Sequence, residues 1–224
     1  MDSLRMLSDA FDYTKEALWG RWVRWLLLIV STILFPFICG YTVRVMSGAK
    51  PAPELKGWIG LFVDGIKLLV ITVIYAIPIW VIALVGFVAY FIPVSATTTP
   101  GPGSGSGLGP EAGIFVAIAL FVVFIVLAVV VGILSTFAMV RFARTGRVGE
   151  AFRFGALLSH IGRVGWLDVF IALLILGIVV AVAQFILLLI PVLGVPLLFI
   201  LMPAFIIFTY RYIALVYESA PASA

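Results

Sequence analysis

A basic segment, residues 141–163, separates two long apolar runs and limits the folds open to this chain. It carries five of the fourteen Lys and Arg residues. Clusters of Lys and Arg between apolar runs are typical of cytoplasmic loops, because these cations resist transfer across a bilayer. A weaker cluster of the same kind extends over residues 44–67. The pattern predicts a multi-pass membrane protein with both basic segments in the cytoplasm.

The composition favours a lipid environment over water. Apolar residues make up 64% of the 224 residues and charged residues only 11%, whereas a soluble domain is about half apolar and a quarter charged. The net charge of +4 is concentrated at the ends of the apolar runs. This distribution favours anionic lipid headgroups as partners and argues against nucleic acid, whose binding needs a solvated basic face.

The apolar runs predict an all-α integral membrane protein with about five transmembrane helices and additional interfacial amphipathic helices. Each span needs about 20 predominantly apolar residues. The expected segments are an N-terminal amphipathic helix (1–20), a first repeat of two spans (21–93), a flexible Gly/Ser/Pro-rich external loop (94–113), a second repeat of two spans (114–190), a fifth span (191–217) and a polar tail (218–224).

Two of these segments leave alternatives open. The N-terminal helix either lies in the membrane interface or stacks on the helix bundle. In the first apolar run, residues 22–46, Pro36 lies at the middle, where proline kinks or breaks a helix. One crossing by a kinked helix is the main interpretation, and a re-entrant hairpin that breaks at Pro36 is the alternative. The hairpin requires protein around its backbone, because lipid cannot satisfy non-helical backbone groups.

Two stretches of the chain match at an offset of 96 residues. Each predicts a short surface helix with apolar residues at positions i, i+3 and i+4. Each is also flanked by spans, so the chain is expected to hold two parallel span–surface helix–span repeats. The matching apolar positions are Trp58, Leu61 and Phe62 in the first stretch and Phe154, Leu157 and Leu158 in the second.

The charge distribution predicts an orientation in the membrane. Five spans place four of the fourteen cations on the N-terminal side and the remaining ten with the repeat loops. The positive-inside rule then puts the N-terminus outside and the C-terminus in the cytoplasm. The four cations on the outside fit this topology poorly, which keeps the re-entrant alternative open. They are Arg5, Lys15, Arg21 and Arg24.

The segment ICGYTVRVMSG, with the Pro-rich turn and WIGLFVDGIKLLVITVIYAIP that follow, resembles an archaeal multi-pass membrane family catalogued as domain of unknown function 4013. The resemblance covers about residues 21–217, apart from the Gly/Ser-rich loop. It implies the plasma membrane of an archaeon and no particular activity, so no functional residues carry over from it. The residues that carry it are Gly40-Tyr41, Arg44, Pro53, Phe62 and Asp64-Gly65.

Two sets of residues are candidates for interactions. A cationic surface at headgroup level is expected to bind anionic lipid or an acidic partner; it consists of Lys56, Lys67, Arg153 and Arg163. Small residues that let helices approach closely, together with one amide expected to bond a neighbouring helix, are candidates for helix packing and self-association; these are Ala128, Gly132, Thr136, Gly177, Ala181 and Gln184.

The sequence offers little material for catalysis. Metal sites and catalytic sites need clusters of His, Cys or carboxylates, and this chain has one His and one Cys. We therefore expect no catalytic residue, metal or cofactor, and no enzyme. Ser159 and His160 are adjacent on a helix and point in different directions, so we interpret His160 as a solvated interfacial residue.

The favoured function is a non-catalytic membrane scaffold or complex subunit, which self-associates and binds lipid or a partner through its basic helices. A small transporter or an oligomeric channel is the alternative, because parallel repeats and Pro-broken spans are common in transporters. Transporters usually carry ionisable residues within their spans. The spans of this chain have no charge at their middle, which favours the scaffold.

Overall fold

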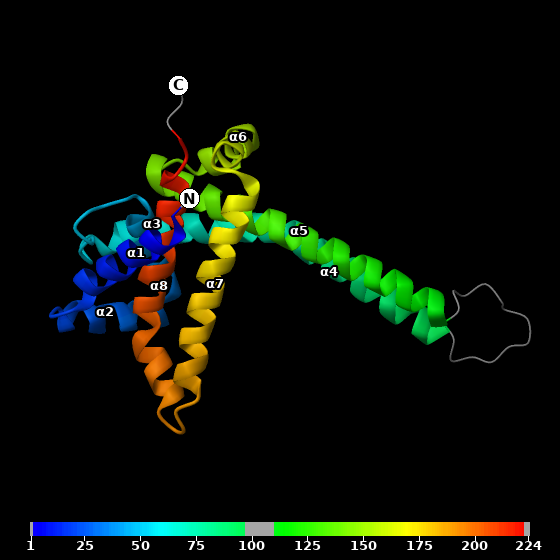
Figure 1. Ribbon diagram of the computed structural model, residues 1–224, viewed down its shortest axis with the longest axis horizontal. Helices are drawn as coiled ribbons and strands as arrows, with labels where there is room; N and C mark the ends of the chain where they lie inside the picture. The colour runs from blue at the N-terminus through cyan, green and yellow to red at the C-terminus, as the bar shows by residue number, and fades with distance from the viewer. Residues whose placement is uncertain (1, 97–109, 222–224) are drawn as a thin grey trace, which may run out of the picture. The chain divides into compact units, whose positions relative to one another are not determined.

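The computed structural model describes residues 2–96 and 110–221, and the side chains of residues 2–88, 114–115 and 118–221. All regular elements in these ranges are helices (Figure 1), so the predicted all-α class is confirmed. The elements are α1 (Ser3–Leu18), α2 (Trp22–Ile33), α3 (Phe35–Met46), α4 (Trp58–Ala96), α5 (Pro110–Thr145), the 3-10 helix η1 (Val148–Phe152), α6 (Phe154–Val164), α7 (Trp166–Leu188) and α8 (Gly194–Glu218).

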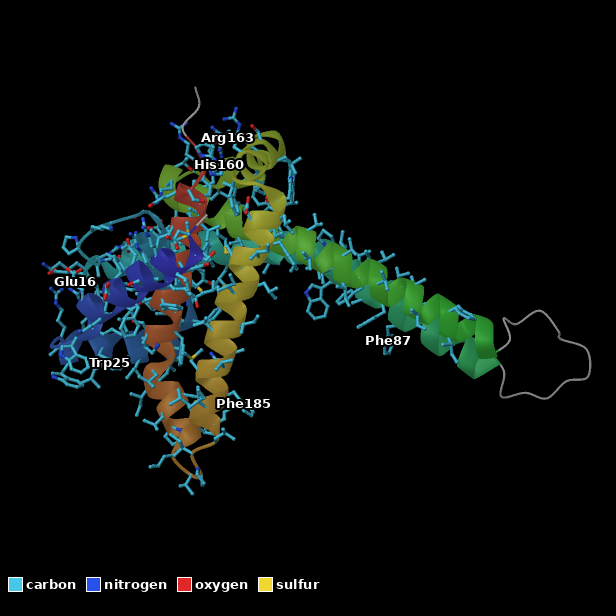
Figure 2. All side chains as sticks on the ribbon, in the orientation of Figure 1. Glu16, Trp25, Phe87, His160, Arg163 and Phe185 are labelled. Carbon is cyan, nitrogen blue, oxygen red and sulfur yellow. The ribbon has the colours of Figure 1, made fainter. Side chains whose placement is uncertain are left out.

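Four of the described helices are long and apolar enough to cross a bilayer. The shortest of them, α7, has 23 residues and is about 34 Å long, against about 30 Å for the hydrocarbon core. Their large apolar side chains remain exposed within the chain, as Phe185 shows on α7 with 61% exposure (Figure 2). The protein is therefore embedded in a membrane, and lipid covers these side chains. The four spans are Trp58–Val88, Ile118–Thr145, Trp166–Leu188 and Gly194–Glu218.

The first apolar run is not a single span. Helix α2 ends at Ile33, and Leu34 leaves the helical conformation with φ −89° and ψ 73°. Pro36, at the start of α3, has no N–H to continue α2, but it is well tolerated in a first helical turn. Each helix has 12 residues and is about 18 Å long, too short to cross the bilayer. The run is therefore interrupted beside Pro36, as the re-entrant alternative requires, and neither helix alone is long enough to be a span.

Helix α4 joins two segments that the sequence predicts as separate, a surface helix starting at Trp58 and a span starting near residue 66. A glycine such as Gly65 weakens a helix by only about 1 kcal/mol, so it does not end one without another breaker. The prediction of a separate surface helix is wrong in this stretch. In the second stretch it is confirmed, because Gly165 adopts φ 102° between α6 and α7, a conformation that favours glycine.

The helices divide into two compact units. The described residues of unit 2, Val73–Ile133, form the C-terminal part of α4 and the N-terminal part of α5, where large side chains such as Trp80 and Phe121 are exposed. Unit 1, formed by Met1–Thr72 and Leu134–Ala224, contains all fourteen Lys and Arg residues. Residues 97–109 of the predicted external loop, and residues 222–224 of the predicted tail, lie outside the described residues.

Helix α8 is the central helix of unit 1, because it packs against α1, α2, α3 and α7. The N-terminal helix stacks on it through one face, so the second of the two alternatives for this segment is confirmed. Asp2 begins α1 by accepting a hydrogen bond from the Arg5 backbone N–H at 3.3 Å. The core residues shared by these helices include Tyr13, Ala17, Leu18, Leu28, Ile38, Tyr41, Val45, Leu61 and Ile207.

Two glycines let α3 and α4 approach each other closely. A Cβ atom at Gly40 would lie 1.8 Å from the carbonyl oxygen of Leu61, and one at Gly65 would lie 1.8 Å from the carbonyl oxygen of Pro36. Neither position has room for a side chain, so the contact requires glycine on both helices. Both glycines belong to the residues that carry the family resemblance.

We expect Gly40→Ala and Gly65→Ala to lower the free energy of unfolding by about 1–3 kcal/mol each, because overpacking forces the two backbones apart. Gly177→Ala on α7 is the matched control, since a Cβ there meets no described atom within 4 Å. Alanine improves helix propensity, so this variant should be as stable as the wild type or slightly more stable. Thermal unfolding in detergent measures all three, and equal stabilities would contradict the close contact.

Candidate functional site

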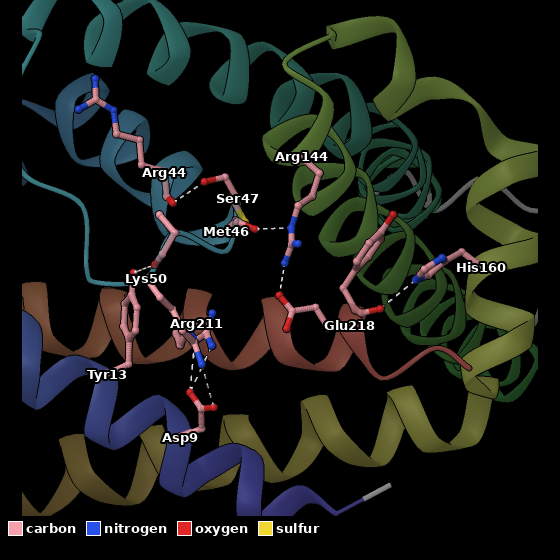
Figure 3. A network of polar contacts seen from close by, with 12 residues as sticks. Asp9, Tyr13, Arg44, Met46, Ser47, Lys50, Arg144, His160, Arg211 and Glu218 are labelled. Carbon is pink, nitrogen blue, oxygen red and sulfur yellow. Dashed lines mark hydrogen bonds and ion pairs between the residues drawn. The ribbon is translucent and has the colours of Figure 1, made fainter. Parts of the chain in front are cut away.

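The polar side chains of unit 1 gather around the C-terminal end of α8 (Figure 3). Side chains from α1, from the α3–α4 loop (residues 47–57), from the end of α5 and from α6 all meet the last turns of α8 here. We call this cluster the polar junction. Its members are Asp9, Tyr13, Met46, Lys50, Arg144, His160, Arg211, Tyr217 and Glu218.

Arg211 is the buried charge of the polar junction, with a side chain only 1% exposed. Its Nε and Nη2 atoms donate to Oδ1 of Asp9 at 3.4 and 3.3 Å. Its guanidinium also lies over the Tyr13 ring, 4.9 Å from the ring centroid, which adds a cation–π attraction. A buried arginine without a counterion is strongly unfavourable. Asp9 therefore holds α1 against the C-terminal end of α8.

Helix α1 also holds the α3–α4 loop. The Tyr13 hydroxyl donates to the carbonyl oxygen of Ala49 at 3.0 Å, and Lys50 pairs with Asp9 at 3.6 Å. Burial raises the pKa of Tyr13 to about 12, so the hydroxyl keeps the proton that it donates. The loop that follows α3 thus lies beside the helix that precedes α2.

Arg24 gives independent evidence that the two ends of residues 22–46 lie close together. Its Nη1 atom is 3.4 Å from the carbonyl oxygen of Ala17, before α2, and 3.5 Å from that of Ala52, after α3. One side chain near the start of the segment therefore reaches both flanks. A single crossing would separate these flanks by the thickness of a membrane, about 30 Å.

Arg144 joins the end of α5 to the same place. Its Nε donates to the carbonyl oxygen of Met46 at 3.0 Å, and its Nη2 pairs with the Glu218 carboxylate. The ends of α3, α5 and α8 are therefore linked through one guanidinium.

His160 links α6 to the end of α8 and is not the solvated residue that the sequence predicts. Its ring stacks on Tyr217 with a centroid distance of 4.1 Å. The Nε2 atom lies 2.9 Å from the Tyr217 carbonyl oxygen, and Nδ1 lies 3.2 Å from Nη2 of Arg163. A neutral ring that donates from Nε2 and accepts at Nδ1 satisfies both contacts. Burial lowers the pKa of His160, and the nearby Arg163 and Arg141 lower it further, against the opposing effect of the Tyr217 carbonyl.

The four cations predicted to bind lipid each have a partner within their own segment. Lys56 pairs with Glu54 at 2.6 Å, Lys67 with Asp64 at 3.6 Å and Arg153 with Glu150 at 2.8 Å, while Arg163 contacts His160. Lys56 and Arg153 are 84% and 65% exposed. Exposed pairs contribute little to stability, so these cations can exchange their carboxylates for other anions.

The two matched stretches have the same burial pattern. Leu61 and Leu157 are fully buried, whereas their apolar neighbours Trp58, Phe62, Phe154 and Leu158 are each about half exposed. Equivalent positions thus play equivalent roles, although one stretch begins a long helix and the other is the separate helix α6. The symmetry of the two repeats within the membrane stays a prediction.

The positions predicted for helix packing lie on α5 and α7. A Cβ atom at Gly132 or Gly177 would meet no described atom within 4 Å. Ala181 and Gln184 are exposed on α7, and Ala128 and Thr136 are half-buried on α5. Packing through these positions stays a prediction.

The sequence interpretation missed the polar junction. The best signal of the polar junction in the sequence is Arg211, because an arginine within a span requires a counterion. The sequence does not indicate which residue is that counterion, since Asp9 lies 202 residues away. Among the described residues, no group of three or more His, Cys, Asp or Glu side chains could hold a metal ion.

The fold and the polar junction define an all-α membrane protein in which the C-terminal ends of the long helices α5 and α8 share a cluster of ion pairs and hydrogen bonds. The family described as Protein of unknown function (DUF4013) matches residues 25–192, which is most of the chain, so the protein belongs to this family. The matched range includes Gly40 and Gly65, the two glycines of the α3–α4 contact. No curated protein and no solved structure matches the chain.

We expect Asp9→Ala to destabilise the protein by about 2 kcal/mol, because it leaves Arg211 buried without a counterion. The value is below that of a fully buried pair, since Asp9 is 39% exposed and solvent weakens the attraction. Asp12→Ala is the matched control, because Asp12 is exposed on the same helix and forms no ion pair with a described residue. Thermal unfolding compares the two variants, and an equal loss in both would refute the role of the ion pair.

Proposed function

We propose that this protein is a non-catalytic membrane subunit whose single basic face binds anionic lipid headgroups. The proposal is supported by the closeness of the two ends of residues 22–46. Arg24 contacts carbonyl oxygens both before and after this segment, and Tyr13 before it bonds to the loop after it. With such a return of the segment, all fourteen Lys and Arg residues lie on one side of the membrane. In the five-span topology, ten lie on one side and four on the other.

The proposed topology has four spans, with both termini and both basic segments in the cytoplasm. The positive-inside rule fits this arrangement much better than the five-span alternative. The Asp9–Arg211 ion pair supports it independently, because the N-terminal helix must lie on the same side as the end of α8. The plasma membrane, which the family resemblance implies, is the proposed location.

Six cations are available to lipid phosphates on this face, because they form no ion pair with a described carboxylate. Each cation at headgroup level contributes about 1 kcal/mol of attraction to anionic lipid, and salt screens it. An acidic partner protein is recognised by the same charges. The six are Lys15, Arg21, Arg24, Arg44, Arg147 and Arg163.

Self-association is the second part of the proposal. The exposed Gln184 supports it, because an amide within the lipid is more favourable when it bonds to another helix. Gly177 and Ala181 lie on the same helix, one turn apart, and would let a second copy approach. Transport is the less favoured function, because the buried charge of unit 1, Arg211, is already compensated by Asp9 within the chain.

The binding of anionic lipid predicts a preference that purification can measure. The delipidated protein in neutral detergent should retain phosphatidylglycerol over phosphatidylcholine with the same acyl chains, because only the former carries a net negative charge. The preference should decrease as salt is added. Native mass spectrometry counts the bound lipids of each kind. Equal retention of both lipids at low salt would refute the proposed function.

The topology predicts which sites an impermeant thiol reagent reaches. In a Cys39→Ala background, Ser8→Cys and Ser159→Cys should be protected in intact cells, while Val192→Cys should be labelled, since Val192 lies in the turn between α7 and α8. All three side chains are exposed in the folded chain. Labelling of Ser8→Cys together with Val192→Cys would instead support the five-span topology.

A further inference from the structure

We propose that the pocket between α2 and the α3–α4 loop binds the phosphate group of one anionic phospholipid. The inference rests on the proposed function and assigns it a specific site. The pocket has a volume of about 190 Å³, and it combines charged and apolar walls. Its lining residues are Val23, Arg24, Leu27, Glu54, Leu55 and Lys56.

The charge of the pocket suits a phosphodiester with one negative charge. Arg24 bonds only to neutral carbonyl oxygens, at 3.4 and 3.5 Å, so its charge is not compensated by a described carboxylate. Lys56 pairs with Glu54, but their side chains are 84% and 57% exposed, and a pair this exposed exchanges readily with other ions. The hydrogen bond from Lys56 lowers the pKa of Glu54, so Glu54 is ionised at neutral pH. Two cations and one carboxylate leave a net charge of +1.

The apolar wall continues into a surface that suits an acyl chain. Val23 and Leu27 line the pocket, and the exposed Leu26 and Val30 extend the apolar surface along α2. A lipid whose phosphate lies between Arg24 and Lys56 can therefore place a chain on this helix. The apolar wall distinguishes a phospholipid from a free phosphate ion, which would gain nothing from it.

Two exposed tryptophans beside the start of α2 suit a pocket at the depth of lipid phosphates. Trp19 and Trp22 are 76% and 70% exposed. Trp22 stacks on Trp25 at a centroid distance of 5.8 Å, and the Trp25 indole N–H donates to the carbonyl oxygen of Ile200 on α8 at 2.8 Å. Tryptophan concentrates at the boundary between headgroups and acyl chains, so the start of α2 is suited to hold Arg24 near the phosphate layer.

Arg44 is a positioning residue for the pocket. Its Nη1 atom donates to the carbonyl oxygens of Glu54 and Lys56, at 3.2 and 2.6 Å. These two bonds fix the backbone on either side of Leu55, which packs against the core of unit 1. The loop wall of the pocket is thereby held in place before any lipid binds, which reduces the entropic cost of binding.

Titration of the purified full-length protein with phosphatidylglycerol, followed by native mass spectrometry, tests the site. Arg24→Gln and Lys56→Gln should each weaken the first binding event about fivefold, the effect of one cation at headgroup level. Glu54→Gln should tighten it, because it removes the opposing charge; a gain in affinity cannot result from misfolding. Arg5→Gln is the matched control, since Arg5 is 89% exposed, already pairs with Asp2 and lies outside the pocket.

Each other outcome has a definite meaning. If Arg5→Gln weakens the first binding event as much as Arg24→Gln, or if Glu54→Gln leaves it unchanged, the cations act together as a diffuse field. The pocket is then refuted while the proposed function stands. If the wild type binds phosphatidylglycerol no better than phosphatidylcholine, the pocket and the proposed function are both refuted. Lys56→Gln controls for misfolding of Arg24→Gln, because Lys56 is 84% exposed and its side chain pairs with the exposed Glu54.

Discussion

The ion pair between Asp9 and Arg211 is the interaction on which the arrangement of unit 1 depends. Arg211 lies in α8, the helix that contacts most of its neighbours, and its side chain is almost fully buried. The counterion, Asp9, belongs to α1, so α1 must pack against the C-terminal part of α8, where Arg211 lies. Tyr13 and Lys50 then attach the α3–α4 loop to α1. One buried charge thus fixes the first 50 residues relative to the last helix.

The re-entrant path of residues 22–46 is possible because α4 shields its backbone. A helix that breaks within a membrane leaves carbonyl groups without helical partners, and lipid cannot satisfy them. Gly65 of α4 lies directly against the Pro36 carbonyl, and Gly40 of α3 lies against the Leu61 carbonyl. The two glycines remove the side chains that would otherwise hold the helices apart. The proline that breaks the run and the glycines that cover the break therefore act together.

Sequence reasoning predicted well the elements that depend only on local pattern. The second repeat was expected to end at residue 190 and α7 occupies Trp166–Leu188, while α8, Gly194–Glu218, nearly coincides with the fifth span expected at 191–217. Continuous apolar length decides such helices. It could not decide whether Pro36 kinks or breaks its helix, because that depends on shielding by Gly65, a tertiary contact. The candidate site was harder still, since Asp9 and Arg211 are far apart in sequence. The four cations that fit the five-span topology poorly were the signal in the sequence that favoured the proposed four-span topology.

The carboxylates of the basic face determine which cations an anion can reach. Arg141 and Arg153 both contact Glu150, whose pKa is lowered chiefly by the hydrogen bond from Arg141, and Arg211 and Lys50 share Asp9. In the proposed function, these carboxylates compete with lipid phosphates for the same cations. The cations left for lipid are then those whose side chains bond only to neutral groups, such as Arg24 and Arg44. Both lie near the ends of residues 22–46, so the proposed return of this segment places the least compensated cations beside the apolar surface of α2.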